Sequence, residues 1–211
     1  MRALIFGGAE IKDYSFLEKY IKDSYIVCCD AGMKHARNMN IVPDIIVGDF
    51  DSVDSDTFEY FKNLKVPFKQ FPCKKDETDM ELGIDAALEK GCNELIITAG
   101  IGSRMDHTMA NMQLLYSLEK DGIKAKLINE NNEVELISKK AEIEGKKGDI
   151  VSLIPMTPEV TGVTTKGLEY ALNDGKLYFG NRIIAVSNVM LSDRAEIEIK
   201  SGLLYVMKCR D

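Results

Sequence analysis

PDIIVGDFDS, residues 43–52, is a short apolar run that ends at a glycine followed by two aspartates. Ile45 to Val47 predict a buried strand, and Asp49 and Asp51 then lie at its carboxyl end. Ligands bind beyond the carboxyl ends of the strands in open α/β sheets. Two carboxylates at that place could hold a divalent cation against phosphate oxygens, or they could belong to an acidic turn that caps the next helix.

From the N-terminus to about residue 129, short apolar runs alternate with patterns of helical period. Uninterrupted apolar strands separated by helices are typical of a mostly parallel sheet that is covered on both faces. We therefore expect a Rossmann-like α/β domain over residues 1–130. The candidate strands are 3–6, 25–29, 45–47, 66–71, 95–98 and 125–128, and the candidate helices are 13–22, 54–64, 78–90 and 103–121.

The last of these candidate helices carries an apolar stripe at spacings of three and four residues and is followed by Gly122. Such a stripe predicts a face that packs on the sheet, and methionines commonly fill gaps in a core. The stripe consists of Met105, Met109, Met112, Leu115 and Leu118.

Beyond residue 132 the pattern changes to short, often alternating strands with Gly, Asn and Pro turns between them. This pattern predicts a small antiparallel β-sandwich over residues 131–211. Ser201 and Gly202 separate the last two strands, which favours a hairpin. The candidate strands are 133–138, 149–154, 177–178, 195–200 and 203–207.

The composition excludes several classes of protein. A formal net charge of −7 argues against binding nucleic acid through phosphate neutralisation, which needs a basic face. No apolar run approaches the roughly 20 residues of a membrane span, and residues 1–8 are too short and glycine-broken for a signal peptide. The five cysteines have no C-x-x-C spacing, so we expect reduced thiols and a cytoplasmic protein without membrane association.

Acidic and glycine-rich turns also follow the other predicted strands of the first half. They include CDAG (29–32), KKDETDME (74–81) and AGIGSRMDH (99–107), while Gly7-Gly8 ends the first strand. Because the carboxyl ends of parallel strands meet at one edge of a sheet, we expect these turns to converge.

The turn over 100–104 opens a helix, where glycines let the backbone approach a phosphate and the helix start favours an anion. Arg104 could bind phosphate through its planar guanidinium, or it could pair with a neighbouring carboxylate. His107 could transfer a proton or make a polar contact, and His35 lies in a predicted surface helix without an assigned role.

Taken together, residues 30–32, 43–52, 75–81 and 100–107 resemble, in order and spacing, the motifs of the thiamine pyrophosphokinase family. GLEY (167–170) and VSN (186–188) are similar to the signature of that family's second domain. The chain departs from the family pattern at Ala31, Ser103, Ala171, Val189 and Met190.

The resemblance implies transfer of a pyrophosphoryl group from ATP to the hydroxyl of thiamine, with Mg²⁺, giving thiamine diphosphate and AMP. It also implies a homodimer with active sites at the subunit interface. Asp49, Asp51 and Asp79 would form the catalytic and metal centre, and which of them accepts the hydroxyl proton stays open. Ser187 and Asn188 would bind thiamine. The residues that would bind ATP are Asp30, Asp76, Gly100, Gly102, Ser103, Arg104, Asp106 and His107.

Two other functions remain open from the sequence. One is a related pyrophosphokinase that acts on another hydroxymethyl acceptor, such as a pterin. The other is a non-catalytic nucleotide sensor, although such a protein has no need to keep so many like charges together.

Overall fold

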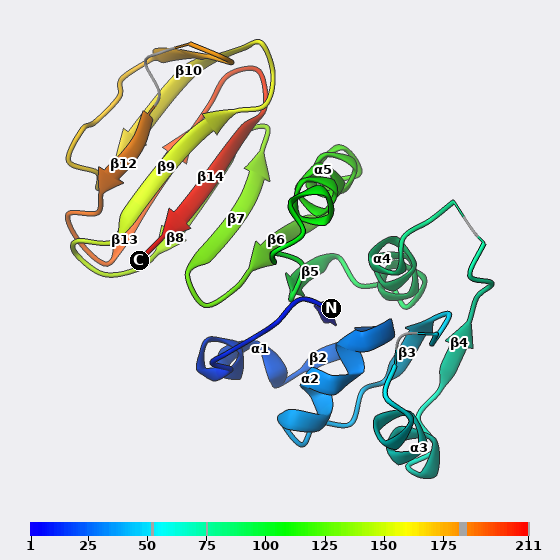
Figure 1. Cartoon of the computed structure of the whole chain (residues 1–211). Coiled ribbons are helices and arrows are strands. Elements are labelled where there is room, and N and C mark those ends of the chain that lie inside the picture. Colours follow the sequence, from blue (N-terminus) through cyan, green and yellow to red (C-terminus); the bar gives the residue numbers. More distant parts are fainter. Residues whose placement is uncertain (52, 75, 182–184, 211) are drawn as a thin grey trace. The chain divides into compact units, whose positions relative to one another are not determined.

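The computed structural model describes residues 1–51, 53–74, 76–181 and 185–210, and it divides into two compact units, Met1–Glu130 and Asn131–Asp211 (Figure 1). Ser52 and Lys75, which belong to two of the motifs, lie outside the described residues. Among the described helices, none is long and apolar enough to cross a membrane.

Unit 1 contains a parallel sheet with the strand order β6-β5-β1-β2-β3-β4, which confirms the predicted α/β fold. Helices follow most of its strands (Figure 1). The first predicted helix is shorter than expected, since a 3₁₀ turn (Ser15–Leu17) precedes a single α-helical turn. The strands are β1 (Arg2–Phe6), β2 (Ser24–Cys29), β3 (Ile45–Gly48), β4 (Phe68–Gln70), β5 (Glu94–Thr98) and β6 (Lys124–Ile128), and the helices are α1 (Glu18–Ile21), α2 (Met33–Asn38), α3 (Ser55–Asn63), α4 (Asp79–Glu89) and α5 (Met105–Lys120).

The strand order reverses at β1, because β2, β3 and β4 follow on one side of it and β5 and β6 on the other. In open α/β sheets this reversal opens a crevice at the carboxyl ends of the two central strands, where ligands bind. The loops that leave β1 and β5 are joined there. Gly7 N donates to Thr98 O at 2.8 Å, and Ala9 N donates to Ala99 O at 2.9 Å.

Both faces of this sheet are covered, as uninterrupted apolar strands require. On one face, Leu4 and Phe6 are fully buried against Met33 of α2 and Phe61 of α3. On the other face, α4 packs on β2 and β3, and its Gly83 lies against Cys29. Cys28 and Cys29 are therefore buried strand residues, as the sequence predicts.

The predicted core stripe of α5 is wrong at its N-terminal end, because Met105 is 66% exposed and Met109 is 48% exposed. Thr108 and Asn111 face inward instead, together with Leu115 and Leu118. The polar pair is buried because its side chains bind the backbone of the turn over 100–102, so the methionines of the same helical turns face outward.

Unit 2 consists of two antiparallel layers with the strand orders β12-β9-β14-β7 and β11-β10-β13-β8, which confirms the predicted β-sandwich. Apolar residues from both layers form one core, including Val151 and Leu204 from the first and Val160 and Ile197 from the second. The strands are β7 (Asn132–Ile137), β8 (Lys140–Glu144), β9 (Ile150–Pro155), β10 (Glu159–Lys166), β11 (Gly175–Tyr178), β12 (Ala185–Val189), β13 (Arg194–Glu198) and β14 (Leu204–Cys209).

The predicted hairpin between the last two strands is wrong. β13 pairs with β8 and β10, whereas β14 pairs with β7 and β9, so the turn at Ser201 and Gly202 crosses from one layer to the other. The reason lies in the partners of that turn. Ser201 exchanges backbone hydrogen bonds with Thr161, and Leu203 N donates to Thr157 Oγ1.

His35 in α2 is only 2% exposed, so its expected place on a surface helix is wrong. Its Nε2 lies 2.8 Å from the Ala9 carbonyl oxygen and its Nδ1 lies 2.8 Å from the Tyr14 hydroxyl. A carbonyl only accepts, so Nε2 donates its proton to Ala9 and Nδ1 accepts from Tyr14. The neutral ring is fully hydrogen-bonded, and burial lowers the pKa of His35 to about 4.

Acidification should therefore weaken folding through His35. Its pKa is lower in the folded chain than in the unfolded chain, so its stabilising contribution is complete above about pH 6.5 and is lost as the pH falls toward about 4. At pH 5 the loss relative to pH 7 is about 2 kcal/mol. We expect the difference in urea-unfolding free energy between the wild type and His35→Gln to shrink by about that amount from pH 7 to pH 5. An unchanged difference would show that His35 is not held neutral by burial.

Candidate active site

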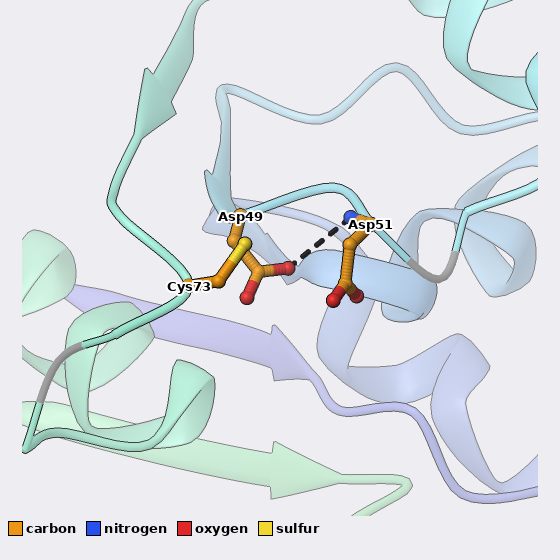
Figure 2. Close-up of side chains that lie close together, drawn as sticks. All are labelled: Asp49, Asp51 and Cys73. Carbon is orange, nitrogen blue, oxygen red and sulfur yellow. Dashed lines mark hydrogen bonds between the residues drawn. The ribbon is translucent and has the colours of Figure 1, made fainter.

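β3 ends at Gly48, and the side chains of Asp49 and Asp51 then project to the same side of the loop (Figure 2). The Asp51 N–H donates to Asp49 Oδ1 at 3.2 Å, which closes a short turn between them. Phe50 stands between the two aspartates with a φ of +63°, in the left-handed region. The structure thus brings together the two carboxylates that the sequence places at the end of this strand.

Cys73 is the third member of this cluster and was not predicted from the sequence. One ligating atom each from Asp49, Asp51 and Cys73 lies within 4.8 Å of the others (Figure 2). The Asp49 carboxylate, with smaller effects of desolvation and Asp51, raises the pKa of the Cys73 thiol, which therefore stays neutral. Carboxylate oxygens suit a hard divalent cation and a neutral thiol does not, so the pair of aspartates is the part of the cluster that fits Mg²⁺.

Asp30, directly after β2, ties two of the converging loops together. Its Oδ1 accepts the N–H of Phe50 at 3.1 Å. Burial raises the pKa of Asp30, and the charges of Asp79 and Asp49 raise it further. Gly48 lets the loop pass this close, because a Cβ at Gly48 would lie 3.0 Å from Cβ of Asp30 and its φ is +151°.

Asp79 is the first residue of α4 and is half-buried. Thr78 caps the helix, since Thr78 Oγ1 accepts from Glu81 N and Glu81 Oε2 accepts from Thr78 N, the reciprocal arrangement of a capping box. The start of a helix stabilises a carboxylate. Asp79 acts electrostatically on Asp30, yet among the described residues it lies outside the 4.8 Å group, and Asp76 is exposed in the preceding turn.

Two inward-facing side chains of α5 hold the glycine turn. Asn111 Nδ2 donates to Gly100 O at 2.8 Å, and the N–H of Gly102 donates to Thr108 Oγ1 at 3.1 Å. The amide of Gly102, expected to face an anion, is therefore bound to a hydroxyl of its own chain. Thr108 and Asn111 were missed from the sequence, and their signal is a polar pair spaced by three residues on the inner face of a helix.

Arg104 and Asp106 form an exposed bidentate ion pair, with Nε to Oδ1 at 3.2 Å and Nη2 to Oδ2 at 2.6 Å. Arg104 thus pairs with a neighbouring carboxylate, which is one of the two roles that the sequence left open for it. Hydrogen bonding from Arg104 lowers the pKa of Asp106 to about 2. Ser103 and His107 are also exposed, so the start of α5 offers a polar surface to a ligand.

In unit 2, β12 contains an irregularity in register between Ala185 and Asn188. Ser187 lies within it with a φ of +58°, and its N–H donates to Ser152 Oγ at 3.1 Å. Asn188 is buried, and its side-chain amide accepts from Tyr170 N at 3.0 Å and donates to Tyr170 O at 2.8 Å. Asn188 therefore joins the two signature segments of this unit, whereas Ser187 is exposed.

Two family models match the chain. One is described as "Thiamin pyrophosphokinase, catalytic domain" and covers residues 17–127, and the other as "Thiamin pyrophosphokinase, vitamin B1 binding domain" and covers residues 134–204. The chain belongs to the thiamine pyrophosphokinase family.

Individual relatives agree with this family. The chain is 28% identical over 185 residues to thiamine pyrophosphokinase of Bacillus subtilis, covering 86% of each protein. It is 27% identical to thiamine pyrophosphokinase 1 of Oryza sativa subsp. japonica, covering 82% of this chain and 69% of that protein. The crystal structure of the Bacillus subtilis protein matches the whole of both chains with a TM-score of 0.91 and 26% identity.

Proposed function

We propose that this family member is a thiamine pyrophosphokinase, which transfers the terminal two phosphates of ATP as one group to the hydroxyl of thiamine and releases AMP. The observation that carries the proposal is the pair of Asp49 and Asp51 at the carboxyl end of a parallel strand, with Asp30 bound to the N–H of Phe50 between them, in a chain that matches both domains of the family. Residues 1–130 bind ATP with Mg²⁺, and residues 131–211 bind thiamine.

In this reaction the hydroxyl oxygen of thiamine attacks the β-phosphorus of ATP. A new oxygen–phosphorus bond forms while the bond from the β-phosphorus to the oxygen that bridges it to the α-phosphorus breaks. AMP leaves with that bridging oxygen and its electron pair. The hydroxyl proton passes to a carboxylate, for which Asp49, Asp51 and Asp79 are the candidates. Such transfers depend mainly on positioning and on neutralising charge.

Asp49 and Asp51 would hold the Mg²⁺ ion, with Asp79 as a further carboxylate of the same centre. Bound there, Mg²⁺ would neutralise the repulsion between the carboxylates and the triphosphate. The start of α5 orients the nucleotide. The further ATP-binding residues in this proposal are Asp30, Asp76, Gly100, Gly102, Ser103, Arg104, Asp106 and His107.

Thiamine carries a permanent positive charge on its thiazolium ring, which suits an acidic site. In unit 2, Ser187 offers an exposed hydroxyl to thiamine, and Asn188 contributes by fixing the backbone of Tyr170.

We assign the protein to the cytoplasm and expect a homodimer with active sites at the subunit interface. Light scattering coupled to size-exclusion chromatography would measure twice the 23.6 kDa mass of one chain if the homodimer is correct.

Arg104→Gln should separate a nucleotide-binding arginine from a merely structural one. An exposed ion pair contributes little to stability, so the free energy of unfolding should change little. A lost charged hydrogen bond to phosphate costs about 1.5–3 kcal/mol, so the KM for ATP should rise about tenfold or more. Arg194→Gln is the matched control, because Arg194 makes a comparable exposed pair with Glu142 in unit 2. Equal KM values for ATP in the two variants would show that Arg104 does not bind ATP and only forms its ion pair with Asp106.

A panel of acceptors tests the proposed function. Purified protein is incubated with ATP, Mg²⁺ and either thiamine or a hydroxymethyl pterin, and AMP is measured. We expect AMP to form with thiamine and not with the pterin. AMP with the pterin alone would identify a related pyrophosphokinase, and ATP binding without AMP from either acceptor would identify a nucleotide sensor.

A further inference from the structure

Phe50 has a backbone conformation that is unusual for an aromatic residue. Its φ of +63° lies in the left-handed region, which bulky side chains rarely adopt. Residues in such conformations persist only where their surroundings hold them, and they concentrate at functional sites. Phe50 is held in this conformation by contacts of its ring and by a hydrogen bond of its backbone.

The side chain of Phe50 is anchored in a cluster of three aromatic rings. Its ring centroid lies 5.6 Å from that of Phe58 in α3 and 5.4 Å from that of Phe68 in β4. The rings of Phe58 and Phe68 are themselves 5.0 Å apart. The Phe50 ring thus packs against the two elements that follow its loop in sequence, α3 and β4.

The backbone of Phe50 is fixed from a third element, because its N–H donates to Asp30 Oδ1 after β2. With ring and amide both held, the loop curls between Asp49 and Asp51. Residues i and i+2 of an extended strand are about 6.6 Å apart along the chain. In the curled loop the Asp51 N–H reaches the Asp49 carboxylate, and the ligating oxygens of the two residues lie within 4.8 Å (Figure 2).

We infer that Phe50 is the positioning residue of the metal site, holding Asp49 and Asp51 at the separation that one divalent cation requires. The identity of that cation as Mg²⁺ rests on the proposed function. Phe50 makes no contact with substrate in this role, and it acts through the two carboxylates that flank it. Its loss should therefore weaken metal binding more than it changes the transfer step at saturating metal.

The test is a titration of the 211-residue chain with Mn²⁺, followed by electron paramagnetic resonance. Residues that orient metal ligands typically change affinity about 10–100-fold, so Phe50→Ala should weaken Mn²⁺ binding at least about tenfold. Phe50→Tyr keeps the ring and should bind like the wild type. The matched control is Phe58→Leu, which removes one ring of the cluster while Phe68 and Asp30 still hold Phe50, and it should stay within about twofold of the wild type.

Wild-type affinity in Phe50→Ala, or an equal loss in Phe58→Leu, would overturn the inference. Thermal unfolding shows whether each variant is folded, and Phe50→Leu replaces Phe50→Ala if the latter does not fold. If the wild type forms thiamine diphosphate and Phe50→Ala binds Mn²⁺ as tightly as the wild type, the proposed function is supported and the role of Phe50 is refuted. A wild type that binds Mn²⁺ but forms no product, with weak binding in Phe50→Ala, would refute only the proposed function.

Discussion

Replacing both Asp49 and Asp51 by asparagine should reduce transfer activity by about 10³-fold or more. A bound metal supplies several kcal/mol of charge stabilisation, and asparagine removes both charges that hold it. The fold should survive, because asparagine keeps the oxygen that accepts the N–H of Asp51. Two like charges within 4.8 Å also repel, so the variant should be at least as stable as the wild type.

The matched control is Asp44→Asn, which makes the same chemical change at the opposite end of β3. Asp44 Oδ2 accepts the N–H of Ile26 at 2.8 Å, a bond that asparagine retains. This variant should keep its activity within about twofold, since it loses no group of the site. Activity is measured as AMP formed at saturating ATP and Mg²⁺. If the double variant keeps a tenth of the wild-type rate, the metal role of Asp49 and Asp51 is wrong.

Gly32→Ala should destabilise the fold by about 3 kcal/mol. A Cβ at Gly32 would overlap the carbonyl oxygen of Phe6 and would lie 2.9 Å from that of Gly7, and neither backbone atom can move as a side chain can. The start of α2 would have to separate from the end of β1, where the strand order reverses. Asp30 would shift with it, so activity should fall as well.

Gly8→Ala is the control for this substitution, because the nearest heavy atom to the new Cβ is Cβ of Ala31 at an ordinary 3.7 Å. It should change the unfolding free energy by about 0.5 kcal/mol or less. Both variants are compared with the wild type by urea unfolding followed by circular dichroism. A cost below about 1 kcal/mol for Gly32→Ala would show that the junction of β1 and α2 is not tightly packed.

The parallel sheet could be predicted because each apolar run ends in its own turn chemistry, which specifies strand ends locally. The burial of His35 could not be predicted, since it depends on hydrogen bonds to Ala9 and Tyr14 across 26 and 21 residues of sequence. Met105 and Met109 were placed in the core by periodicity alone. The hydrogen bonds of Thr108 and Asn111 to the glycine turn oppose that periodicity, and they appear only once the turn is built.

The pairing of Asp49 with Asp51 follows from their spacing and could be predicted. Cys73 could not, because its place beside them depends on the register of β3 with β4, in which Gly48 lies opposite Gln70. The hydrogen bond from the N–H of Tyr170 to the side-chain oxygen of Asn188 likewise depends on the irregular register of β12. Contacts set by pairing register are where a single sequence is least informative.

The most direct test of the central claim is phosphorus NMR of a reaction containing the wild-type chain, ATP, Mg²⁺ and thiamine. Pyrophosphoryl transfer predicts AMP and thiamine diphosphate in equal amounts as ATP is consumed. Formation of ADP with thiamine monophosphate, or ATP that persists unchanged, would contradict it.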